Sequence, residues 1–448
     1  MSASEKAQQL RSLIGLLTDA SEIVIKEWEA EEQRDGNTGG NALPSQELYD
    51  ARRVIRGACG MCADMVGDPL NRLEELSHGA LSLMEALYIL VAARIPDILA
   101  EMAPGEGMPI YELSRRTEID DMKLARVLRL LCTSHVLSEV KSDHFANTRT
   151  SLVLVRNEPA QSLLLMNGFG VYMKSMDKLP SVLMDPVKSR ATAPNQSAFQ
   201  EAVGTDLTFW EWCEQGVEQP DGTVQPRPLH KTFSMAMMAT GQIVSSSISS
   251  DYPWAALGSA TVVDVGGGVG SMAMELAAQF PQLRFVVADR GPVIEQGQAL
   301  WMSKMPSAIQ DGRVSLQAQD FFQEQPIKGA EVYFLRYILH DWPDDVCVTI
   351  LKRLRDAMSA NSRILVADMV MHTTVGSPLL KSAPTPLPAN YGCASVFKNM
   401  QDLAMLALFN GTERTPEQLS ALAARAGLRV VKIWECRSIL SITEMRLP

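Results

Sequence analysis

The residues that could support chemistry follow short apolar runs of the kind that form buried strands. A glycine run, residues 266–270, follows the β-branched stretch Thr261–Val265. Single polar side chains stand at the ends of later runs, and these are Asp289, Asp320, His340 and Asp368. Ligands of open parallel sheets bind outside the carboxyl ends of the strands. The spacing therefore predicts that these side chains meet at one edge of a sheet.

The glycine run predicts a tight loop that a ligand can approach closely. Gly266 and Gly268 lack side chains, and the stretch Ser271–Gln279 after the loop has the pattern of a helix. A strand, a glycine loop and a helix N-terminus form the layout of a nucleotide-type cofactor site. The same layout also serves as a plain tight turn, so the loop alone does not identify the cofactor.

Two acids beyond the loop favour an adenosine group as the ligand. Asp289 lies about twenty residues past the loop, where a carboxylate can accept hydrogen bonds from a ribose diol. Asp320 can bind an adenine amine, and the neighbouring Phe321 can cover the ring. Each acid alone could be a helix cap or a surface residue. Their order at successive strand ends favours the adenosine-binding interpretation.

His340 is the candidate general base. It follows an apolar run and precedes Asp341 and Trp342. An imidazole, with an ordinary pKa near 6.5, can accept a proton near neutral pH. The carboxylate of Asp368 or Glu413 could orient its other ring nitrogen, as in catalytic triads. The alternative is a structural histidine.

The elements that must position these residues form two patterns. From Thr261 onward, strands at 284–288, 314–318, 332–339 and 363–367 alternate with helices, and a hairpin at 427–443 closes the chain. This alternation predicts a doubly wound α/β sheet. A Pro- and Gly-rich stretch, residues 374–388, predicts an exposed loop over the site. Residues 156–250 are expected to be mostly helical, with a polar loop at 219–228 and a Met-rich helix at 230–249.

The N-terminal third predicts helices and a winged helix. An amphipathic helix is expected at 5–32 and a second helix at Gln46–Val66, joined by a flexible linker at 34–44. A long helix reaching residue 93 and two short helices at 110–116 and 120–131 precede a hairpin, which is the winged-helix pattern. Arg126 and Arg129 on the second short helix make DNA binding an alternative to protein contacts.

Composition limits the function classes. The chain has 448 residues and a net charge of −11, which disfavours nucleic acid as a partner. Seven cysteines without framework spacing indicate reduced thiols in a cytoplasmic protein. The only CxxC, Cys59 to Cys62, has no second pair, so no metal site is predicted. No stretch predicts a membrane span or a signal peptide.

The combined motifs resemble S-adenosylmethionine-dependent O-methyltransferases, most closely the plant caffeic-acid type and fungal secondary-metabolite enzymes. The resemblance is carried by residues 263–270, by Asp289 and Asp320, and by the segments 339–345 (LHDWPDD) and 410–415 (NGTERT). It covers roughly residues 80–448. It implies a class I methyltransferase sheet, doubly wound and mixed, with an N-terminal winged-helix dimerisation domain.

The resemblance implies domains and roles. The domains would be a helical extension at 1–75, a winged-helix dimerisation domain at 76–160, and a cofactor-binding catalytic domain at 161–448, with a substrate-pocket segment at 161–250. Gly266, Gly268 and Asp289 would hold the methionine and ribose portions of the cofactor. Asp320 and Phe321 would bind adenine, and Arg336 stands where the family has a lysine. His340 would be the base, flanked by Glu413 and by Asp368, where plant enzymes usually have Glu.

The leading hypothesis is a homodimeric O-methyltransferase that methylates a phenolic or polyketide-like hydroxyl and yields S-adenosylhomocysteine. A second hypothesis keeps the cofactor in a pericyclic or dehydration step without methyl transfer. A third is a winged-helix regulator with a vestigial cofactor domain. A dehydrogenase fits less well, because Ser271 stands where the dinucleotide fingerprint has its third Gly or Ala.

Overall fold

The structure is a computed structural model that describes residues 2–33, 43–103, 105–168, 170–225 and 227–448. Its contacts divide the chain into two compact units, called here the sheet unit (residues 1–67, 192–194 and 243–448) and the helical unit (68–191 and 195–242). The predicted linker at 34–44 lies mostly outside the described residues. In the described part, no helix is long and apolar enough to cross a membrane.

The sheet unit is built on seven strands in the order β11-β12-β10-β9-β6-β7-β8. Five of these strands are parallel, and β12 pairs antiparallel with β10 and β11. The strands are β6 (Thr261–Val265), β7 (Arg284–Asp289), β8 (Val314–Ala318), β9 (Val332–Arg336), β10 (Arg363–Asp368), β11 (Arg429–Glu435) and β12 (Ser441–Arg446). This is the predicted doubly wound mixed sheet.

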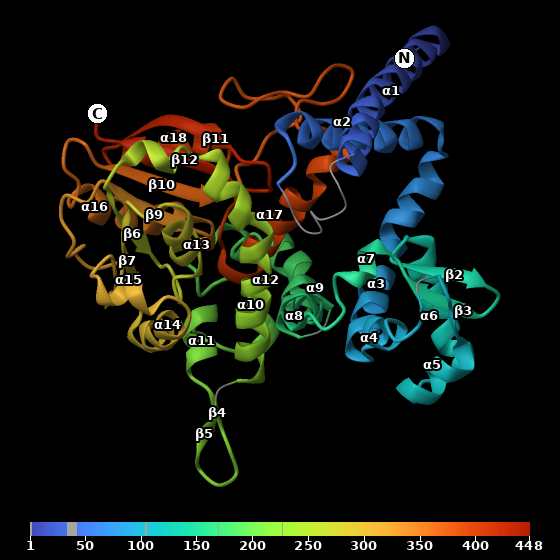
Figure 1. The fold of residues 1–448 in the computed structure, drawn as a ribbon, viewed down its shortest axis with the longest axis horizontal. Coiled ribbons are helices and arrows are strands. Elements are labelled where there is room, and N and C mark those ends of the chain that lie inside the picture. Colours follow the sequence, from blue (N-terminus) through green and yellow to red (C-terminus); the bar gives the residue numbers. More distant parts are fainter. Residues whose placement is uncertain (1, 34–42, 104, 169, 226) are drawn as a thin grey trace. The chain divides into compact units, whose positions relative to one another are not determined.

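Helices cover both faces of this sheet (Figure 1). Alternate residues of β6 enter different cores, because Val262 packs with one helix layer and Val263 with the other. One layer is α13 (Ser271–Gln279), α14 (Gly291–Lys304), α15 (Pro306–Gln310) and the end of α12 (Pro228–Asp251). The other is α16 (Asp344–Arg355) and α18 (Pro416–Arg425). The strand order reverses beside β6, which pairs with β7 and β9, so their carboxyl ends frame the crevice where ligands bind in such folds.

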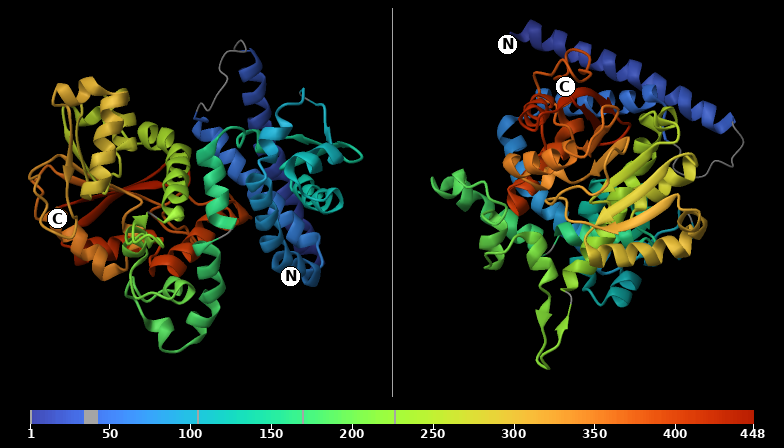
Figure 2. Two further views of the ribbon diagram at one scale, coloured as in Figure 1. Left: turned by 90° about the horizontal axis from the view of Figure 1, so that it is seen from below. Right: turned by 90° about the vertical axis from the view of Figure 1, so that its left-hand side faces the viewer.

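The N-terminal helices α1 (Ala3–Gln33) and α2 (Gln46–Val66) pack against each other in the sheet unit (Figure 2). Leu13 and Leu48 share a small core with Leu387 and Tyr391, which lie in or just after the predicted exposed loop. Lys381 of that loop also pairs with Asp50 of α2. The loop at 374–388 is therefore anchored on α2, although most of its side chains are exposed.

The helical unit contains a short sheet in the order β1-β3-β2, next to helices α5 and α6. This matches the predicted winged-helix pattern of two helices and a hairpin. Its helices are α3 (Pro69–Ala92), α4 (Ile95–Leu99), α5 (Ile110–Thr117), α6 (Asp121–Thr133), α7 (Arg149–Leu152), α8 (Glu158–Gly168), α9 (Val171–Met184), α10 (Ala198–Val203) and α11 (Phe209–Glu214). Its strands are β1 (Met108–Pro109), β2 (Leu137–Lys141), β3 (His144–Asn147), β4 (Val217–Glu218) and β5 (Val224–Gln225).

Two local predictions differ from the structure. The expected polar loop at 219–228 includes one strand of a short hairpin, β4 paired with β5. The strand predicted at 332–339 ends at Arg336, because Tyr337 has a φ of +57° and left-handed backbone cannot continue a strand. The domain boundaries predicted at residues 75 and 160 stay predictions, and the observed contacts group residues 1–67 with the sheet unit instead.

Candidate active site

The glycine loop joins β6 to α13 and is closed on one side only. Gly266 and Gly268 have φ values of +67° and +61°, in the left-handed region that favours glycine. A Cβ added at Gly266 would lie 2.5 Å from Ile338 Cδ1, whereas one added at Gly268 would meet no atom within 4 Å. The loop therefore leaves open space beside Gly268, where a ligand can approach the backbone.

Asp289 at the end of β7 meets the glycine loop. Its Oδ2 accepts a hydrogen bond from the Gly268 main-chain nitrogen at 2.8 Å, and its Oδ1 accepts one from Arg290 N at 2.7 Å. A carboxylate has about four acceptor positions, so both oxygens can still accept from hydroxyl donors. The structure thus brings together two of the predicted cofactor-site elements, which are 21 residues apart in sequence.

Asp264 on β6 is a candidate that the sequence analysis missed. Its side chain is only 3% exposed, and its Oδ2 has no hydrogen-bond partner. Burial raises the pKa of Asp264 to about 7, although the Arg336 charge opposes this shift. A buried, unpaired carboxyl oxygen is costly and needs an explanation such as a bound donor. The signal was visible in the sequence as an acid between valines in the strand that leads into the loop.

Asp320 and Phe321 follow β8, as predicted, but they differ in their contacts. Asp320 Oδ1 accepts a hydrogen bond from Phe322 N at 2.9 Å, so this carboxylate stabilises the turn that begins at Asp320. The Phe321 ring reaches the glycine loop, because its Cε1 atom would lie 3.6 Å from a Cβ at Gly266. Phe321 therefore borders the space beside the loop.

Arg336, the last residue of β9, interacts both with a group at the glycine loop and with the residue that follows it toward His340. Its charge lowers the pKa of Asp264 beside the glycine loop. Its guanidinium carbon lies 5.7 Å from the centre of the Tyr337 ring, and that ring lies 5.3 Å from the His340 ring. The phenol oxygen of Tyr337 is buried and has no hydrogen-bond partner, so Tyr337 is a second polar group that the sequence analysis overlooked.

His340 lies in a short 3-10 turn, Leu339–Asp341, which follows Tyr337. Its side chain is buried, and its Nδ1 lies 2.8 Å from Glu413 Oε1. A carboxylate can only accept, so Nδ1 carries a hydrogen and Nε2 is the nitrogen that can gain or lose a proton. The two residues are 73 positions apart, and Glu413 is 2% exposed.

Three carboxyl groups set the charge around His340. Burial by itself would lower the pKa of His340, but Glu413 and Asp341 outweigh it and raise that pKa to about 10. Asp341 Oδ1 lies 3.4 Å from Nε2, whereas Asp368 acts on the imidazole through its charge. Burial raises the pKa of Asp368 to about 6, and its Oδ1 has no hydrogen-bond partner. Of the two predicted orienting acids, Glu413 holds the ring.

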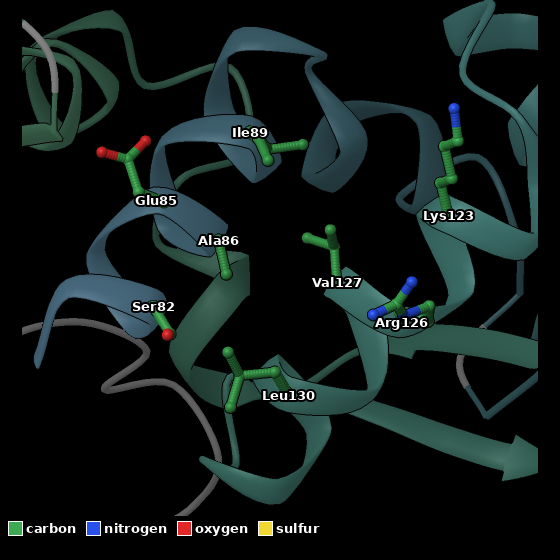
Figure 3. A pocket seen from close by; sticks show the side chains of 8 residues that line it. All are labelled: Ser82, Glu85, Ala86, Ile89, Lys123, Arg126, Val127 and Leu130. Atoms are coloured by element: carbon green, nitrogen blue, oxygen red, sulfur yellow. The ribbon is translucent and has the colours of Figure 1, made fainter. Parts of the chain in front are cut away.

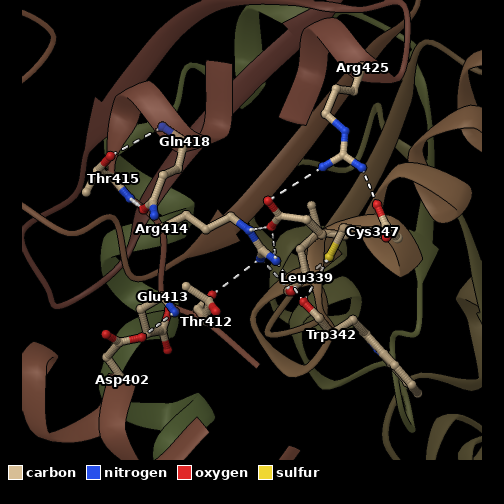
Figure 4. Close-up of polar contacts among 12 residues, drawn as sticks. Leu339, Trp342, Cys347, Asp402, Thr412, Glu413, Arg414, Thr415, Gln418 and Arg425 are labelled. Carbon is tan, nitrogen blue, oxygen red and sulfur yellow. Dashed lines mark hydrogen bonds and ion pairs between the residues drawn. The ribbon is translucent and has the colours of Figure 1, made fainter. Parts of the chain in front are cut away.

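A buried arginine joins the two segments that carry His340 and Glu413 (Figure 4). Arg414 donates to the main-chain oxygens of Leu339 at 2.8 Å and Trp342 at 2.7 Å, and pairs with Asp344 at 2.9 Å. Thr412 N donates to His340 O at 2.9 Å. A Cβ at Gly411 would overlap that same oxygen, so only glycine allows the segments to approach this closely.

Comparison with known proteins identifies the family. A sequence model described as an O-methyltransferase domain matches residues 183–429, more than half of the chain. O-methyltransferase gedA of Aspergillus terreus is 41% identical over 98% of this chain and 96% of its own length. The chain belongs to the S-adenosylmethionine-dependent O-methyltransferases.

Solved structures agree with this methyltransferase assignment. CalO1, a methyltransferase in calicheamicin biosynthesis solved with S-adenosylhomocysteine, matches with a TM-score of 0.65 and 26% identity over 85% of this chain and all of CalO1. A pericyclic-reaction enzyme matches with a TM-score of 0.68 at 21% identity over 96% of this chain and all of its own, which shows a shared fold. The predicted family, enzyme class and mixed α/β fold with a helical N-terminal region are confirmed.

Among the residues that the structure describes, no group of three or more His, Cys, Asp or Glu side chains could hold a metal ion. Cys59 and Cys62 are free thiols on α2.

Proposed function

We propose that this methyltransferase transfers a methyl group to a hydroxyl of a phenolic or polyketide-like small molecule, with His340 as the general base. The observation that carries the proposal is the buried pair of His340 and Glu413, in which the Nδ1 contact leaves Nε2, 3.4 Å from Asp341 Oδ1, as the nitrogen that exchanges a proton. The conditions for general-base catalysis are a fixed tautomer and an available nitrogen near the substrate.

The cofactor site is proposed at the glycine loop. Gly266 and Gly268 would face the cofactor through their main chain, and Asp289 would accept hydrogen bonds from the ribose. Support comes from the open space beside Gly268 and from the unpaired buried oxygen of Asp264, which suits an amino or hydroxyl donor. Asp320 and Phe321 would border the adenine, and Arg336 would lie between cofactor and base.

In this mechanism the residues move one proton and hold two groups in place. S-adenosylmethionine held at the glycine loop would supply an electrophilic methyl group, with S-adenosylhomocysteine as the product. Nε2 of His340 accepts the acceptor's hydroxyl proton, which converts a poor nucleophile into a good one. Glu413 stabilises the resulting imidazolium and keeps the ring in the productive tautomer. The remaining rate enhancement comes from positioning the acceptor oxygen.

An apolar acceptor is supported by α17 (Val396–Phe409) in the sheet unit. Phe397, Met400 and Leu403 are exposed at helical spacing on this helix, which also leads to the segment with Glu413. Met405 and Phe409 on the same helix are buried. Exposed aromatic and thioether side chains suit a flat, apolar substrate.

The test incubates the full chain with methyl-labelled S-adenosylmethionine and a panel of phenols and aromatic polyketides. We expect label in one product, with S-adenosylhomocysteine released in equal amount. Conversion of a substrate without release of S-adenosylhomocysteine would identify the pericyclic or dehydration alternative instead. Its present support is the fold likeness to a pericyclic enzyme at 21% identity, which carries the fold alone.

We also propose that the enzyme is a homodimer that assembles through the helical unit. The first half of α3 is exposed and carries Leu70, Leu73 and Leu76. The second half of α3 and α6 line a pocket of about 330 Å³ (Figure 3). Its apolar side chains are flanked by charged residues, and the lining is Ser82, Glu85, Ala86, Ile89, Lys123, Arg126, Val127 and Leu130. Light scattering should give the mass of a dimer for wild type and that of a monomer for Leu73→Glu. A dimer mass for Leu73→Glu would contradict this interface.

The winged helix gives little support to the hypothesis of a DNA-binding regulator. Arg129 on α6 forms ion pairs with Glu139 and Asp143, so its charge is already matched by acids. Arg116 likewise pairs with Glu101. Salt-dependent binding of duplex DNA would be required to support this role. The predicted cytoplasmic location stays a prediction.

A further inference from the structure

The side chain of Asp402 contacts the main chain that carries Glu413. Asp402 lies on α17, and its Oδ1 accepts a hydrogen bond from Glu413 N at 2.8 Å. The helix ends at Phe409, and Asn410 takes a φ of +52° that turns the chain back along the helix. Burial raises the pKa of Asp402, while the bond from Glu413 N favours its charged form. Figure 4 shows this contact beside the Arg414 network.

The Glu413 carboxylate depends on its own main chain for its position. One oxygen contacts His340 Nδ1, whereas its other oxygen, Oε2, is buried without a hydrogen-bond partner. No second side-chain bond therefore fixes the carboxylate from the far side, among the residues that the structure describes. The direction of the Glu413 side chain follows from where its backbone is held, and Asp402 supplies a side-chain acceptor there.

We propose that Asp402 is a positioning residue for His340 and acts through the main chain of Glu413. It fixes the Glu413 N–H group, so that the Glu413 carboxylate meets Nδ1 and the imidazole keeps Nε2 toward the acceptor. The proposal rests on the proposed role of His340 as base. Asp402 itself touches neither the imidazole nor the reacting atoms, so its effect on turnover is indirect.

Charge and geometry can be separated at this position. Apart from burial, two charged groups act on the Asp402 carboxyl: Glu413 raises its pKa and Arg414 lowers it. Asparagine keeps an oxygen that can accept from Glu413 N but removes the negative charge. Alanine removes both. A positioning role therefore predicts that Asp402→Asn retains what Asp402→Ala loses.

The experiment compares Asp402→Ala, Asp402→Asn and the control Asp345→Ala in the full chain. Asp345 is an exposed acid that forms an ion pair with Arg425 on the surface of the same region. We expect kcat to fall about 10- to 100-fold in Asp402→Ala, with the Kd for S-adenosylhomocysteine within about twofold of wild type. Asp402→Asn should keep at least about a third of the wild-type kcat. Wild-type kcat in Asp402→Ala, or equal loss in both variants, would overturn the proposal.

A readout independent of turnover distinguishes this proposal from the base assignment. Nitrogen NMR of labelled histidines, with His340 assigned from His340→Asn, should show a protonated, hydrogen-bonded Nδ1 in wild type and Asp402→Asn. That signal should shift or broaden in Asp402→Ala. If it does so while His340→Asn retains full turnover, Asp402 positions the ring but the ring is not the base. An unchanged signal in Asp402→Ala contradicts the positioning role.

Discussion

The two halves of the candidate site are constructed differently. The glycine-loop half joins main-chain groups to the Asp289 carboxylate within one stretch of consecutive strand, loop, helix and strand. The His340 half uses side chains from segments 73 residues apart, held by Arg414 and Asp402. The difference teaches where each half is vulnerable. The loop half depends on backbone conformation, and the base half depends on tertiary contacts between distant segments.

The largest effect is expected from removal of the base. His340→Asn replaces a proton acceptor with an amide, so kcat should fall about 10²- to 10⁴-fold. Binding of S-adenosylhomocysteine, measured by calorimetry, should stay near wild type because the loop half is intact. His135→Asn, at an exposed histidine, is the matched control. Normal turnover in His340→Asn would remove the general-base role.

A substitution in the glycine-loop half should weaken cofactor binding and leave kcat nearly unchanged. Asp289→Ala leaves the Gly268 N–H group without its acceptor and removes the proposed ribose ligand. A hydrogen bond to a charged group contributes about 1.5–3 kcal/mol, so the Kd for S-adenosylhomocysteine should rise about 10- to 100-fold. The kcat at saturating cofactor should change only a few-fold. If kcat falls and Kd does not, the division into two halves is wrong.

Alanine substitutions at two glycines distinguish the cost of a steric clash between segments from the cost of backbone strain. Gly411→Ala would place a Cβ on His340 O and should cost about 1–3 kcal/mol of stability with a clear loss of kcat. Gly268→Ala meets no neighbour, so its cost should be the left-handed backbone alone, about 1–2 kcal/mol. Its functional defect should appear in cofactor affinity. Thermal unfolding and cofactor titration of both variants test this; identical defects would contradict it.

The smallest effect is a proton released on cofactor binding. The pKa of His340, raised to about 10, means that the imidazole is protonated at pH 8–9 before the cofactor binds. A sulfonium cation disfavours a second positive charge nearby, so S-adenosylmethionine should release up to about one proton more than the neutral S-adenosylhomocysteine. Because a proton leaves, affinity for S-adenosylmethionine should increase as pH rises toward 10.

Calorimetry in two buffers of different ionisation enthalpy measures that release. His340→Asn should abolish the difference between the two cofactors. Equal proton release by S-adenosylmethionine and S-adenosylhomocysteine in wild type would place the raised pKa elsewhere or show that the ring is already neutral.

Much of the fold could be predicted because local pattern and burial agree. The helix Gln46–Val66 and the strand Val314–Ala318 have the predicted bounds, and the start of the helix is fixed locally by its Ser45 cap. The end of β9 was misplaced, because the left-handed turn at Tyr337 depends on its surroundings rather than on its residue type. The grouping of residues 1–67 with the sheet unit depends on contacts such as those of Leu48 with Leu387, which no local pattern encodes.

The sequence by itself determined the order of strands and helices, the glycine loop and the choice of His340 as the histidine that follows a strand. It left open whether Asp368 or Glu413 orients that histidine, and it did not single out Asp264, Tyr337 or Asp402. Only the tertiary structure decided these points. Hydrogen bonds such as that between His340 and Glu413 require two distant segments to be packed at a fixed spacing, and that spacing arises from the whole sheet and the Arg414 network.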